Sequence, residues 1–179
     1  MPPVLVRREV RADHARVRGV HLAAFAREDG APVAEADLVD RLRAGPWFLP
    51  ALSLVALAAP DAPGADVVGH VIATRGTIEP SGAPALGLGP LGVVPAWQRR
   101  GVGSALMHAL LGAAEATDET VVCLLGSPRY YCRFGFRPAV EAGIAAPDPA
   151  WGGAFQVRTF GTGRVPSGTF RYAAPFDEL

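Results

Sequence analysis

The sequence predicts an α/β fold in which one mixed β-sheet carries helices on both faces. Hydrophobic runs of strand length alternate with segments whose hydrophobic residues recur every three or four positions, as in amphipathic helices. The runs 51–59 and 67–78 are joined by turn residues and predict an antiparallel hairpin. The run 119–125 lacks polar alternation, which is typical of a parallel strand buried on both faces. With 179 residues, half of them hydrophobic, the chain has the length of a single domain, 1–179.

The N-terminal part of the chain predicts one strand and two helices. Val4–Arg8 alternates hydrophobic and charged residues, as a strand does. Ala12–Arg27 has helical spacing, and Asp13 is placed to cap or complement the start of that helix. After a polar break, a second helix is expected over Val33–Arg43 and ends before Gly45.

The middle of the chain predicts three strands. Ala51–Ala59 and Val67–Ile78 form the hairpin, and its turn over 60–64 contains two prolines and a glycine. The loop 79–84 leads to a third strand over 86–94, in which glycine and proline predict a bulge or the close approach of another backbone. The residues concerned are Gly87, Gly89, Pro90 and Gly92.

A long helix is expected from Val102, because hydrophobic residues then recur at positions 102, 105, 106, 109, 110 and 113. Gly101 and Gly103 fall in its first turn, where glycine is unfavourable and needs a reason. Helix N-termini carry unpaired N–H groups and a partial positive charge, so a turn without side chains lets a phosphate reach the backbone. Arg99 and Arg100 add two cations there. The alternative is that the glycines only allow the helix to pack closely on the strand.

Two common phosphate-binding motifs are excluded at this loop. A dinucleotide-binding loop needs a third glycine where this chain has Leu106. A P-loop needs a lysine, and the chain contains none. What remains is the spacing of residues from Gln98 to Gly103.

The C-terminal part predicts a buried strand, a short helix and two more strands. A helix between the strands 86–94 and 119–125 implies a right-handed crossover. Ser127 and Pro128 suit the first positions of a short helix that ends at Gly135. Further strands are expected over Ala154–Phe160 and Thr169–Tyr172, with a turn at Pro166–Gly168 between them.

Two motifs resemble those of the GNAT-fold N-acetyltransferase superfamily. The segment from Gln98 to Gly103 resembles its Q/R-x-x-G-x-G/A pyrophosphate loop. The segment from Ser127 to Phe136 resembles the A-x-x-x-Y-x-K/R-x-G-F signature that follows this loop. Two motifs in this order, about 25 residues apart, are more specific than either alone. The ending GTFRYAAPFDEL is similar to that of a bacterial, YhbS-like branch of predicted N-acetyltransferases, so the resemblance covers nearly the whole chain.

The resemblance implies a GNAT fold, with a splayed mixed sheet of about seven strands that the segment 154–172 extends. It implies an acyltransferase that moves acetyl from acetyl-CoA, its co-substrate, to a primary amine in a ternary complex, without a covalent intermediate or a metal. The acceptor would be a small-molecule amine or an amine of a peptide or protein. The alternative is a GNAT-fold module that binds CoA or acyl-CoA as a sensor or partner and catalyses little.

The resemblance assigns binding of the donor to three segments. The edge of the third strand would pair with the amides of pantetheine and direct an N–H near Val93 or Val94 at the thioester carbonyl. The glycine loop would hold the pyrophosphate, and the short helix would border the thioester. The donor-binding residues implied are Leu91, Gly92, Val93, Val94, Gln98, Arg99, Arg100, Gly101, Val102, Gly103, Ser104, Ser127, Tyr130, Tyr131 and Arg133.

Tyr131 is the residue that the resemblance assigns to catalysis. A phenol is protonated at neutral pH and can give a proton to a departing thiolate, which makes Tyr131 the expected general acid. Tyr130 would pack or line the acyl pocket. The alternative for Tyr131 is a buried tyrosine whose hydroxyl has an ordinary structural partner.

A general base is not evident, because the third strand carries no carboxylate where many relatives have one. Six acidic or histidine side chains lie near loops or strands that could border an acceptor cleft, although each could be an ordinary surface charge or packed histidine. They are Glu28, Asp29, Glu35, Glu79, His21 and His70. Deprotonation of the amine through water would need none of them.

Composition argues against several classes of partner. Seventeen arginines balance seventeen acids, so neither nucleic acid nor an anionic membrane is an expected partner. The hydrophobic runs are too short to span a bilayer, and Cys123 and Cys132 have no neighbours at metal-ligand spacing, so a cytoplasmic protein with reduced cysteines is expected.

The acceptor is expected to be selected by three segments, 28–36, 79–84 and 141–153, the last of which contains Trp151. Trp151 could face a cleft or simply pack. The sequence leaves open whether the protein is a monomer or a homodimer.

Overall fold

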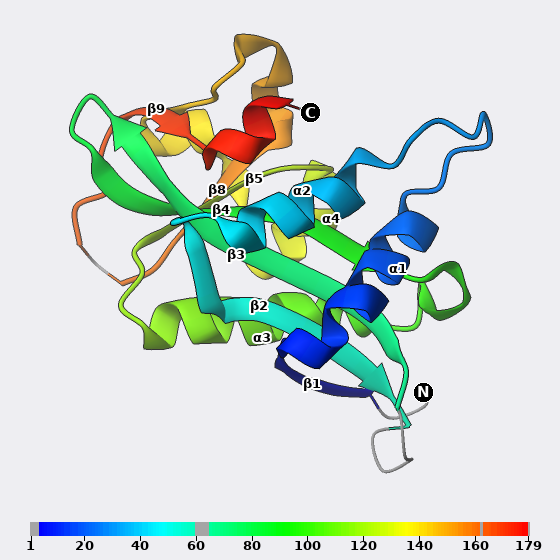
Figure 1. The fold of residues 1–179 in the computed structure, drawn as a ribbon. Helices are drawn as coiled ribbons and strands as arrows, with labels where there is room; N and C mark the ends of the chain where they lie inside the picture. Colours follow the sequence, from blue (N-terminus) through cyan, green and yellow to red (C-terminus); the bar gives the residue numbers. More distant parts are fainter. Residues whose placement is uncertain (1–3, 60–64, 162, 179) are drawn as a thin grey trace.

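One mixed β-sheet runs through the described part of the chain and carries helices on both faces (Figure 1). The computed structural model describes residues 4–59, 65–161 and 163–178. The sheet has nine strands, and its main path has the order β1-β2-β3-β4-β5-β8-β6. The strand β9 pairs with β3 and with β7, so the C-terminal part of the chain extends the sheet, as expected.

The strands are β1 (Val4–Arg8), β2 (Phe48–Ala58), β3 (Val67–Glu79), β4 (Ala83–Val93), β5 (Val121–Leu125), β6 (Arg137–Pro138), β7 (Ile144–Ala145), β8 (Phe155–Thr159) and β9 (Gly168–Arg171). The α-helices are α1 (His14–Ala24), α2 (Ala34–Ala44), α3 (Val102–Ala116) and α4 (Pro128–Tyr131). Short 3₁₀ turns occur at Arg11–Asp13, Pro95–Trp97, Cys132–Phe134, Ala139–Ala142, Pro149–Ala154 and Ala174–Glu178.

Each of the seven strands expected from the sequence has a counterpart in the structure. The two additional strands, β6 and β7, have two residues each and are too short to leave a pattern in the sequence. The antiparallel pairing of β2 with β3 and the parallel pairing of β4 with β5 are confirmed. The expected turn over 60–64 lies outside the described residues.

Two details near the N-terminus differ from expectation. The first helix ends at Ala24 and not at Arg27, because Phe25 leaves the helical conformation and stacks its ring on His21. Asp13 does not cap this helix through its side chain. Its carboxylate instead accepts hydrogen bonds from the Arg7 guanidinium and from the Val10 N–H, which ties the start of the helix to β1.

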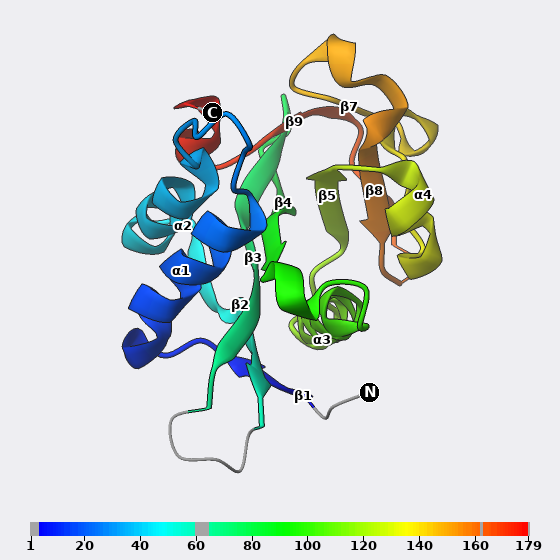
Figure 2. The ribbon, with the colours of Figure 1, turned by 90° about the vertical axis from the view of Figure 1, so that its right-hand side faces the viewer.

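Two hydrophobic layers hold the helices on the sheet. On one face α3 buries Val102, Leu106 and Leu110 against β2, β3 and β4. On the other face α1 and α2 bury Val17 and Leu38, among others, against β2 and β3. Figure 2 shows these two helices on the side of the sheet opposite to α3. None of the helices in the described segments has both the length and the apolar character needed to cross a membrane.

The sheet opens between β4 and β5. These parallel strands share only two residue pairs, Leu86 with Val122 and Gly87 with Cys123, before they diverge toward their carboxyl ends (Figure 2). A bulge at Gly89–Pro90 lies just beyond the last pair: Val71 and Ala73 of β3 are two positions apart, but their partners on β4 are three apart. The bulge that glycine and proline predict is therefore confirmed.

The close packing of β9 on β3 leads to a prediction about stability. Gly168 has φ of +142°, and a Cβ placed there would collide with the carbonyl oxygen of Glu79. We expect Gly168→Ala to destabilise the fold by about 3 kcal/mol, from backbone strain and overpacking together. The control is Gly112→Ala on α3, where nothing lies within 4 Å and alanine is expected to stabilise the helix by about 0.5–1 kcal/mol. Urea unfolding measures both changes, and equal stability of the two variants would contradict the prediction.

Candidate active site

Two cavities flank the opening between β4 and β5. We call the first the polar cavity; its volume is about 590 Å³. It is lined by Leu91, Val93, Gln98, Arg99, Gly101, Gly103, Ser104, Tyr130 and Arg133. We call the second the apolar pocket, of about 390 Å³, lined by Phe25, Glu35, Leu38, Leu88, Gly89, Pro90, Leu91, Leu125, Tyr131, Trp151, Tyr172 and Phe176. Leu91 lines both, so the two spaces adjoin at the edge of β4.

The start of α3 presents unpaired N–H groups to the polar cavity. Gly101 precedes the helix with φ of +83°, a conformation that glycine adopts without strain. The first bond into the helix runs from the Ala105 N–H to the Gly101 carbonyl, at 2.9 Å. The N–H groups of residues 102–104 therefore have no acceptor within the helix, and with the helix dipole they favour an anion.

Gly103 keeps this cavity open. A Cβ at Gly103 would lie 2.9 Å from the Tyr130 hydroxyl oxygen, so any side chain here would narrow the space between α3 and α4. Arg133 lies over the Tyr130 ring, with its guanidinium carbon 4.9 Å from the ring centre. Tyr130 therefore lines the polar cavity and not the apolar pocket, and its ring packs against Tyr131 and Phe134.

The two adjacent arginines of the loop differ in their surroundings. Arg99 lines the polar cavity, whereas Arg100 lies against Trp97, 5.8 Å from the ring centre, and is not part of the lining. Arg133 supplies the second cation of the cavity. Ser127 begins α4 as expected, but its hydroxyl makes no capping bond and it lines neither cavity.

The edge of β4 provides a free N–H at Val93. The Val94 N–H is bonded to the Val68 carbonyl of β3 at 3.0 Å, so it cannot face a ligand. Successive residues of a strand direct their N–H groups to opposite sides, and Val93 therefore directs its own toward the side that β5 has left. The Val93 carbonyl on that side accepts a bond of 2.9 Å from the Gln98 amide. Of the two N–H groups expected to face a thioester carbonyl, those of Val93 and Val94, only the Val93 N–H is therefore available.

Gly92 has a different reason for lacking a side chain than the sequence suggests. A Cβ there would lie 2.9 Å from His21 Nδ1, on the face of the sheet that α1 covers. Gly92 lines neither cavity, and its missing side chain admits the helix. Of the three residues expected to form the strand edge, Leu91 and Val93 line the polar cavity.

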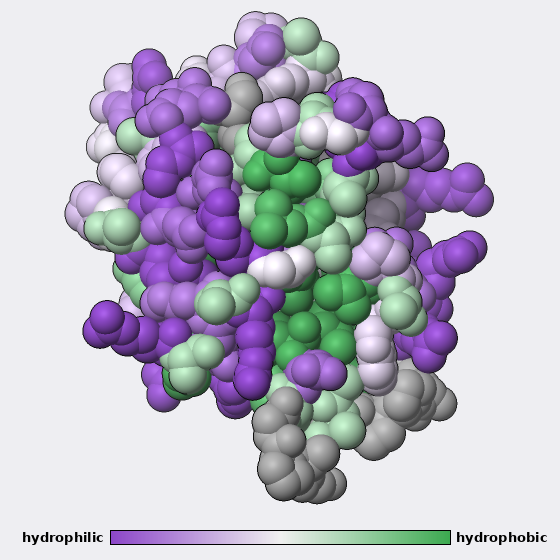
Figure 3. Space-filling model, turned by 45° about the vertical axis from the view of Figure 1, so that its right-hand side comes forward, coloured by the Kyte–Doolittle hydropathy of each residue, from purple (hydrophilic) through white to green (hydrophobic). Residues whose placement is uncertain are grey.

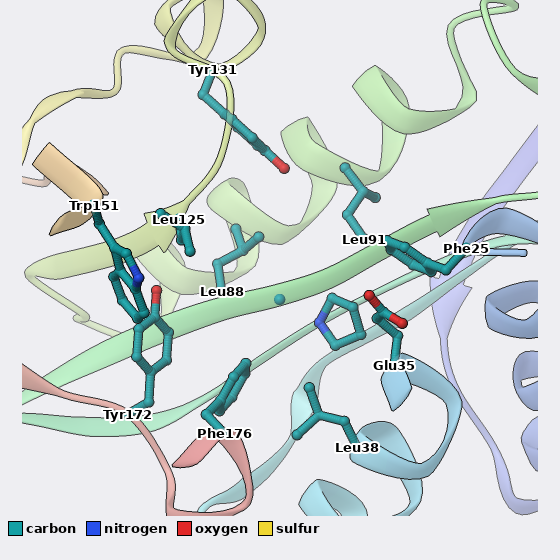
Figure 4. Close-up of a pocket in the computed structure, with 12 residues that line it drawn as sticks. Phe25, Glu35, Leu38, Leu88, Leu91, Leu125, Tyr131, Trp151, Tyr172 and Phe176 are labelled. Atoms are coloured by element: carbon teal, nitrogen blue, oxygen red, sulfur yellow. The ribbon is translucent and has the colours of Figure 1, made fainter. Parts of the chain in front are cut away.

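Tyr131 points its hydroxyl into the apolar pocket (Figure 4). Its ring covers Gly126, where any Cβ would collide with it, and packs against Phe136 and Tyr130. Burial, with a smaller contribution from Tyr130, raises the pKa of Tyr131 to about 12. The phenol therefore stays protonated around neutral pH and is available as a proton donor.

The other walls of the apolar pocket come from distant parts of the chain. Phe25 follows the last residue of α1, Leu38 is on α2, and Tyr172 and Phe176 belong to the C-terminal segment (Figure 4). Trp151 both lines the pocket and packs against Tyr172, so its two interpretations hold together. The face in Figure 3 shows hydrophobic residues gathered in a hollowed band between hydrophilic flanks. Most of these residues carry no signal in the sequence, because hydrophobic side chains outside a motif cannot be told from those of an ordinary core.

Only one of the six candidates for a general base lines either cavity, and it is Glu35. Glu28 is exposed in the loop after α1, and Asp29 accepts a bond from the Ala31 N–H. Glu79 accepts a bond from the Thr77 hydroxyl at 3.0 Å. His21 and His70 are fully buried on the other side of β4.

The two histidines belong to a buried chain of hydrogen bonds. His21 Nε2 lies 2.8 Å from His70 Nδ1, and His70 Nε2 lies 3.0 Å from the Ser53 hydroxyl. The Ser53 hydroxyl donates to Glu9 at 2.5 Å, and Arg43 donates to the other oxygen of Glu9 at 2.6 Å. Burial lowers the pKa of His21 to about 3, so His21 is neutral. The network joins α1, α2, β2 and β3 beneath the site.

Glu9 is the charge that this network stabilises. Burial alone would raise the pKa of Glu9, but His70, Ser53 and Arg43 outweigh it and lower the pKa to about 2. No local pattern in the sequence marks this cluster, because its members are far apart in the chain and none belongs to a motif.

Comparisons with known proteins agree with this geometry. Residues 54–138 match the acetyltransferase (GNAT) domain family. Over 142 residues the chain is 34% identical to the uncharacterized N-acetyltransferase YjhQ of Escherichia coli K12, covering 78% of this chain and 73% of that protein.

Two solved structures share the fold. One is the GNAT family N-acetyltransferase YhbS from Escherichia coli in complex with CoA, with 25% identity, a TM-score of 0.85, and coverage of 99% of this chain and 93% of that one. The other is a GNAT family acetyltransferase from Brucella melitensis in complex with acetyl-CoA, with 32% identity, a TM-score of 0.77, and coverage of 99% and 100%.

The buried Glu9 leads to a prediction about pH. Because its pKa is about 2 in the folded protein and ordinarily 4.5, Glu9 contributes stability that is present above pH 4.5 and is lost as the pH falls toward 2. We expect Glu9→Gln to lower the free energy of unfolding by about 3 kcal/mol at pH 7 and by much less near pH 2.5. Urea titrations at both pH values measure this, with Glu115→Gln on the surface of α3 as the control. If Glu9→Gln lowers the free energy of unfolding by the same amount at both pH values, the prediction is contradicted.

Proposed function

The chain belongs to the GNAT N-acetyltransferase superfamily, and from this premise we propose that it transfers acetyl from acetyl-CoA to a primary amine in a ternary complex. The observation that carries the proposal is the meeting of the two cavities at Leu91, with the N-terminus of α3 on one side and Tyr131 on the other. Two relatives of similar fold hold CoA and acetyl-CoA in their structures. The polar cavity is the proposed donor site, and the apolar pocket is the proposed acceptor site.

The donor site has groups suited to an anionic, amide-rich molecule. The free N–H groups of residues 102–104, with Arg99 and Arg133, would hold the pyrophosphate. The free edge of β4 at Leu91 and Val93 would pair with the pantetheine amides like an added strand. Pantetheine would then run along β4 toward the apolar pocket and place the thioester near Leu91.

The chemistry needs one developing negative charge stabilised and one proton delivered. The Val93 N–H would donate to the thioester carbonyl oxygen as the amine attacks and the C–N bond forms. As the C–S bond breaks, Tyr131 would give its proton to the thiolate, and the nitrogen would return a proton to Tyr131 as the amide forms. Cys123 and Cys132 line neither cavity, and burial raises the pKa of Cys123, which argues against an acetyl-cysteine intermediate.

The donor site is tested by Gly103→Trp, which would fill the space between α3 and Tyr130. We expect calorimetric titration to show micromolar binding of acetyl-CoA by the parent protein and at least a 100-fold weaker affinity for this variant. The control is Gly112→Trp on the same helix, where nothing lies within 4 Å and binding should be retained. If the parent protein does not bind acetyl-CoA, or if both variants bind alike, the proposed donor site is wrong.

The role of Tyr131 is tested by Tyr131→Phe, which removes the hydroxyl and keeps the ring that covers Gly126. We expect kcat to fall about 100-fold, because a general acid contributes that much or more, while the affinity for acetyl-CoA changes little. Release of CoA from acetyl-CoA measures the rate once an amine acceptor is found. An unchanged kcat would remove Tyr131 from the mechanism. Tight binding of acetyl-CoA without turnover of any amine would favour the alternative of a non-catalytic CoA-binding module.

A further inference from the structure

The apolar pocket, which is the proposed acceptor site, has a largely hydrophobic lining with a single carboxylate, that of Glu35. Besides Tyr131, its walls include four aromatic side chains from three separate segments of the chain: Phe25, Trp151, Tyr172 and Phe176. We propose that the acceptor is a primary amine attached to a compact, uncharged and preferably aromatic body, and that Glu35 holds its ammonium group. The inference rests on the acetyl transfer proposed above and names the substrate class of the same site.

Glu35 is the one acid of α2 that is left without a partner among the described residues. Asp37 and Asp40 on the same helix pair with Arg18 at 2.7 Å each, and Asp40 also pairs with Arg43. Glu35 is half-buried, and Figure 4 shows its carboxylate directed into the pocket beside Phe25. A carboxylate placed among hydrophobic walls is most stable when a cation pairs with it, so its position points to an ammonium ligand.

The distribution of charge excludes other acceptors. The lining of the apolar pocket contains no arginine or histidine, so an acceptor with a carboxylate or phosphate would have no cation to pair with. A molecule with several ammonium groups would place at least one of them against hydrophobic walls, at a large cost in desolvation. One amine on an uncharged body satisfies both the carboxylate and the walls.

The geometry also places the amine near the reaction. Glu35 and Tyr131 enter the pocket from opposite walls, and Leu91, which lines both cavities, lies at the junction with the donor site (Figure 4). An ammonium group at Glu35 would therefore be held at the side of the pocket where the thioester is expected. A volume of about 390 Å³ suits a single ring with a short alkyl amine.

Glu35 would also remove the proton that prevents attack. The ammonium group gives one proton to the carboxylate, the free amine forms the C–N bond, and the C–S bond breaks. The second proton leaves the nitrogen to restore Tyr131, which has protonated the thiolate. Glu35 then loses its proton to water, so one amide, one thiol and one proton are formed for each thioester consumed.

The experiment compares 2-phenylethylamine, ethanolamine and 1,4-diaminobutane as acceptors with acetyl-CoA, following CoA release. We expect kcat/KM for 2-phenylethylamine to exceed that for each polar amine by about 50-fold or more, the value expected from burying one phenyl ring. Glu35→Gln should lower kcat/KM for 2-phenylethylamine by about 10- to 100-fold, with acetyl-CoA affinity unchanged. The matched control is Glu115→Gln, which makes the same chemical change on the exposed surface of α3 and should have no effect.

A calorimetric titration of 2-phenylethylamine into the protein, with and without CoA, tests the pocket without turnover. Binding that Glu35→Gln weakens and Glu115→Gln keeps would support the inference even if the donor assignment failed. The inference is overturned if the polar amines are preferred, if Glu35→Gln behaves like the parent protein, or if 2-phenylethylamine neither binds nor reacts. Binding of acetyl-CoA alongside any of these results would leave the proposed function intact, so the two failures are distinguishable.

Discussion

The early separation of β4 from β5 is the constraint on which the candidate site depends. Only two residue pairs join these strands, and the bulge at Gly89–Pro90 lies directly beyond them. A regular ladder would consume the N–H of Val93 and fill the space that both cavities occupy. The edge of β4 is therefore left unpaired at the place where a substrate could bind like an added strand. The hydrophobic layers under α1, α2 and α3 keep the strands in this separated arrangement.

The charged side chains that line the two cavities have opposite signs, so each cavity suits a different substrate. Arg99 and Arg133, with the N-terminus of α3, make the polar cavity suitable for an anion, whereas the lining of the apolar pocket contains one acidic side chain, Glu35, and no basic one. An anionic donor and a cationic acceptor would each be repelled from the other's cavity. Tyr131 lines the apolar pocket and stays protonated at neutral pH, so it adds no charge of its own before it donates its proton.

The sequence indicates more of the residues that line the polar cavity, the proposed donor site, than of those that line the apolar pocket, the proposed acceptor site. The anion site at α3 follows from local spacing, since Gly101 shapes the backbone that precedes the helix. The neighbour for which Gly103 leaves room, the Tyr130 hydroxyl, lies on a separate helix and is not indicated by that spacing. The roles of the glycines in β4 were harder to predict from the sequence, because each glycine is required by a different feature of the folded structure. Gly89 forms the bulge, Gly92 admits His21, and a Cβ at Gly87 would lie 2.6 Å from the Tyr172 ring. These neighbours come from segments that are far apart in the chain, and a local pattern in a single sequence does not predict which distant segments pack together.

The same contrast explains how one scaffold could serve different acceptors. Most of the proposed donor groups lie on a continuous stretch from β4 into α3, and Tyr130 and Arg133 are added from the segment that begins at α4. A change in the continuous stretch would disturb the strand edge and the anion site together. Apart from residues of β4, β5 and α4, the walls of the apolar pocket come from the segment after α1, from α2, from the turn at Trp151 and from the C-terminal segment. The strand β9 holds the C-terminal segment in place by pairing with β3 at Thr77–Glu79. Side chains such as Trp151 and Phe176 can therefore change in size or polarity while the donor site keeps its geometry. Specificity for the amine then resides in the part of the chain that carries no motif.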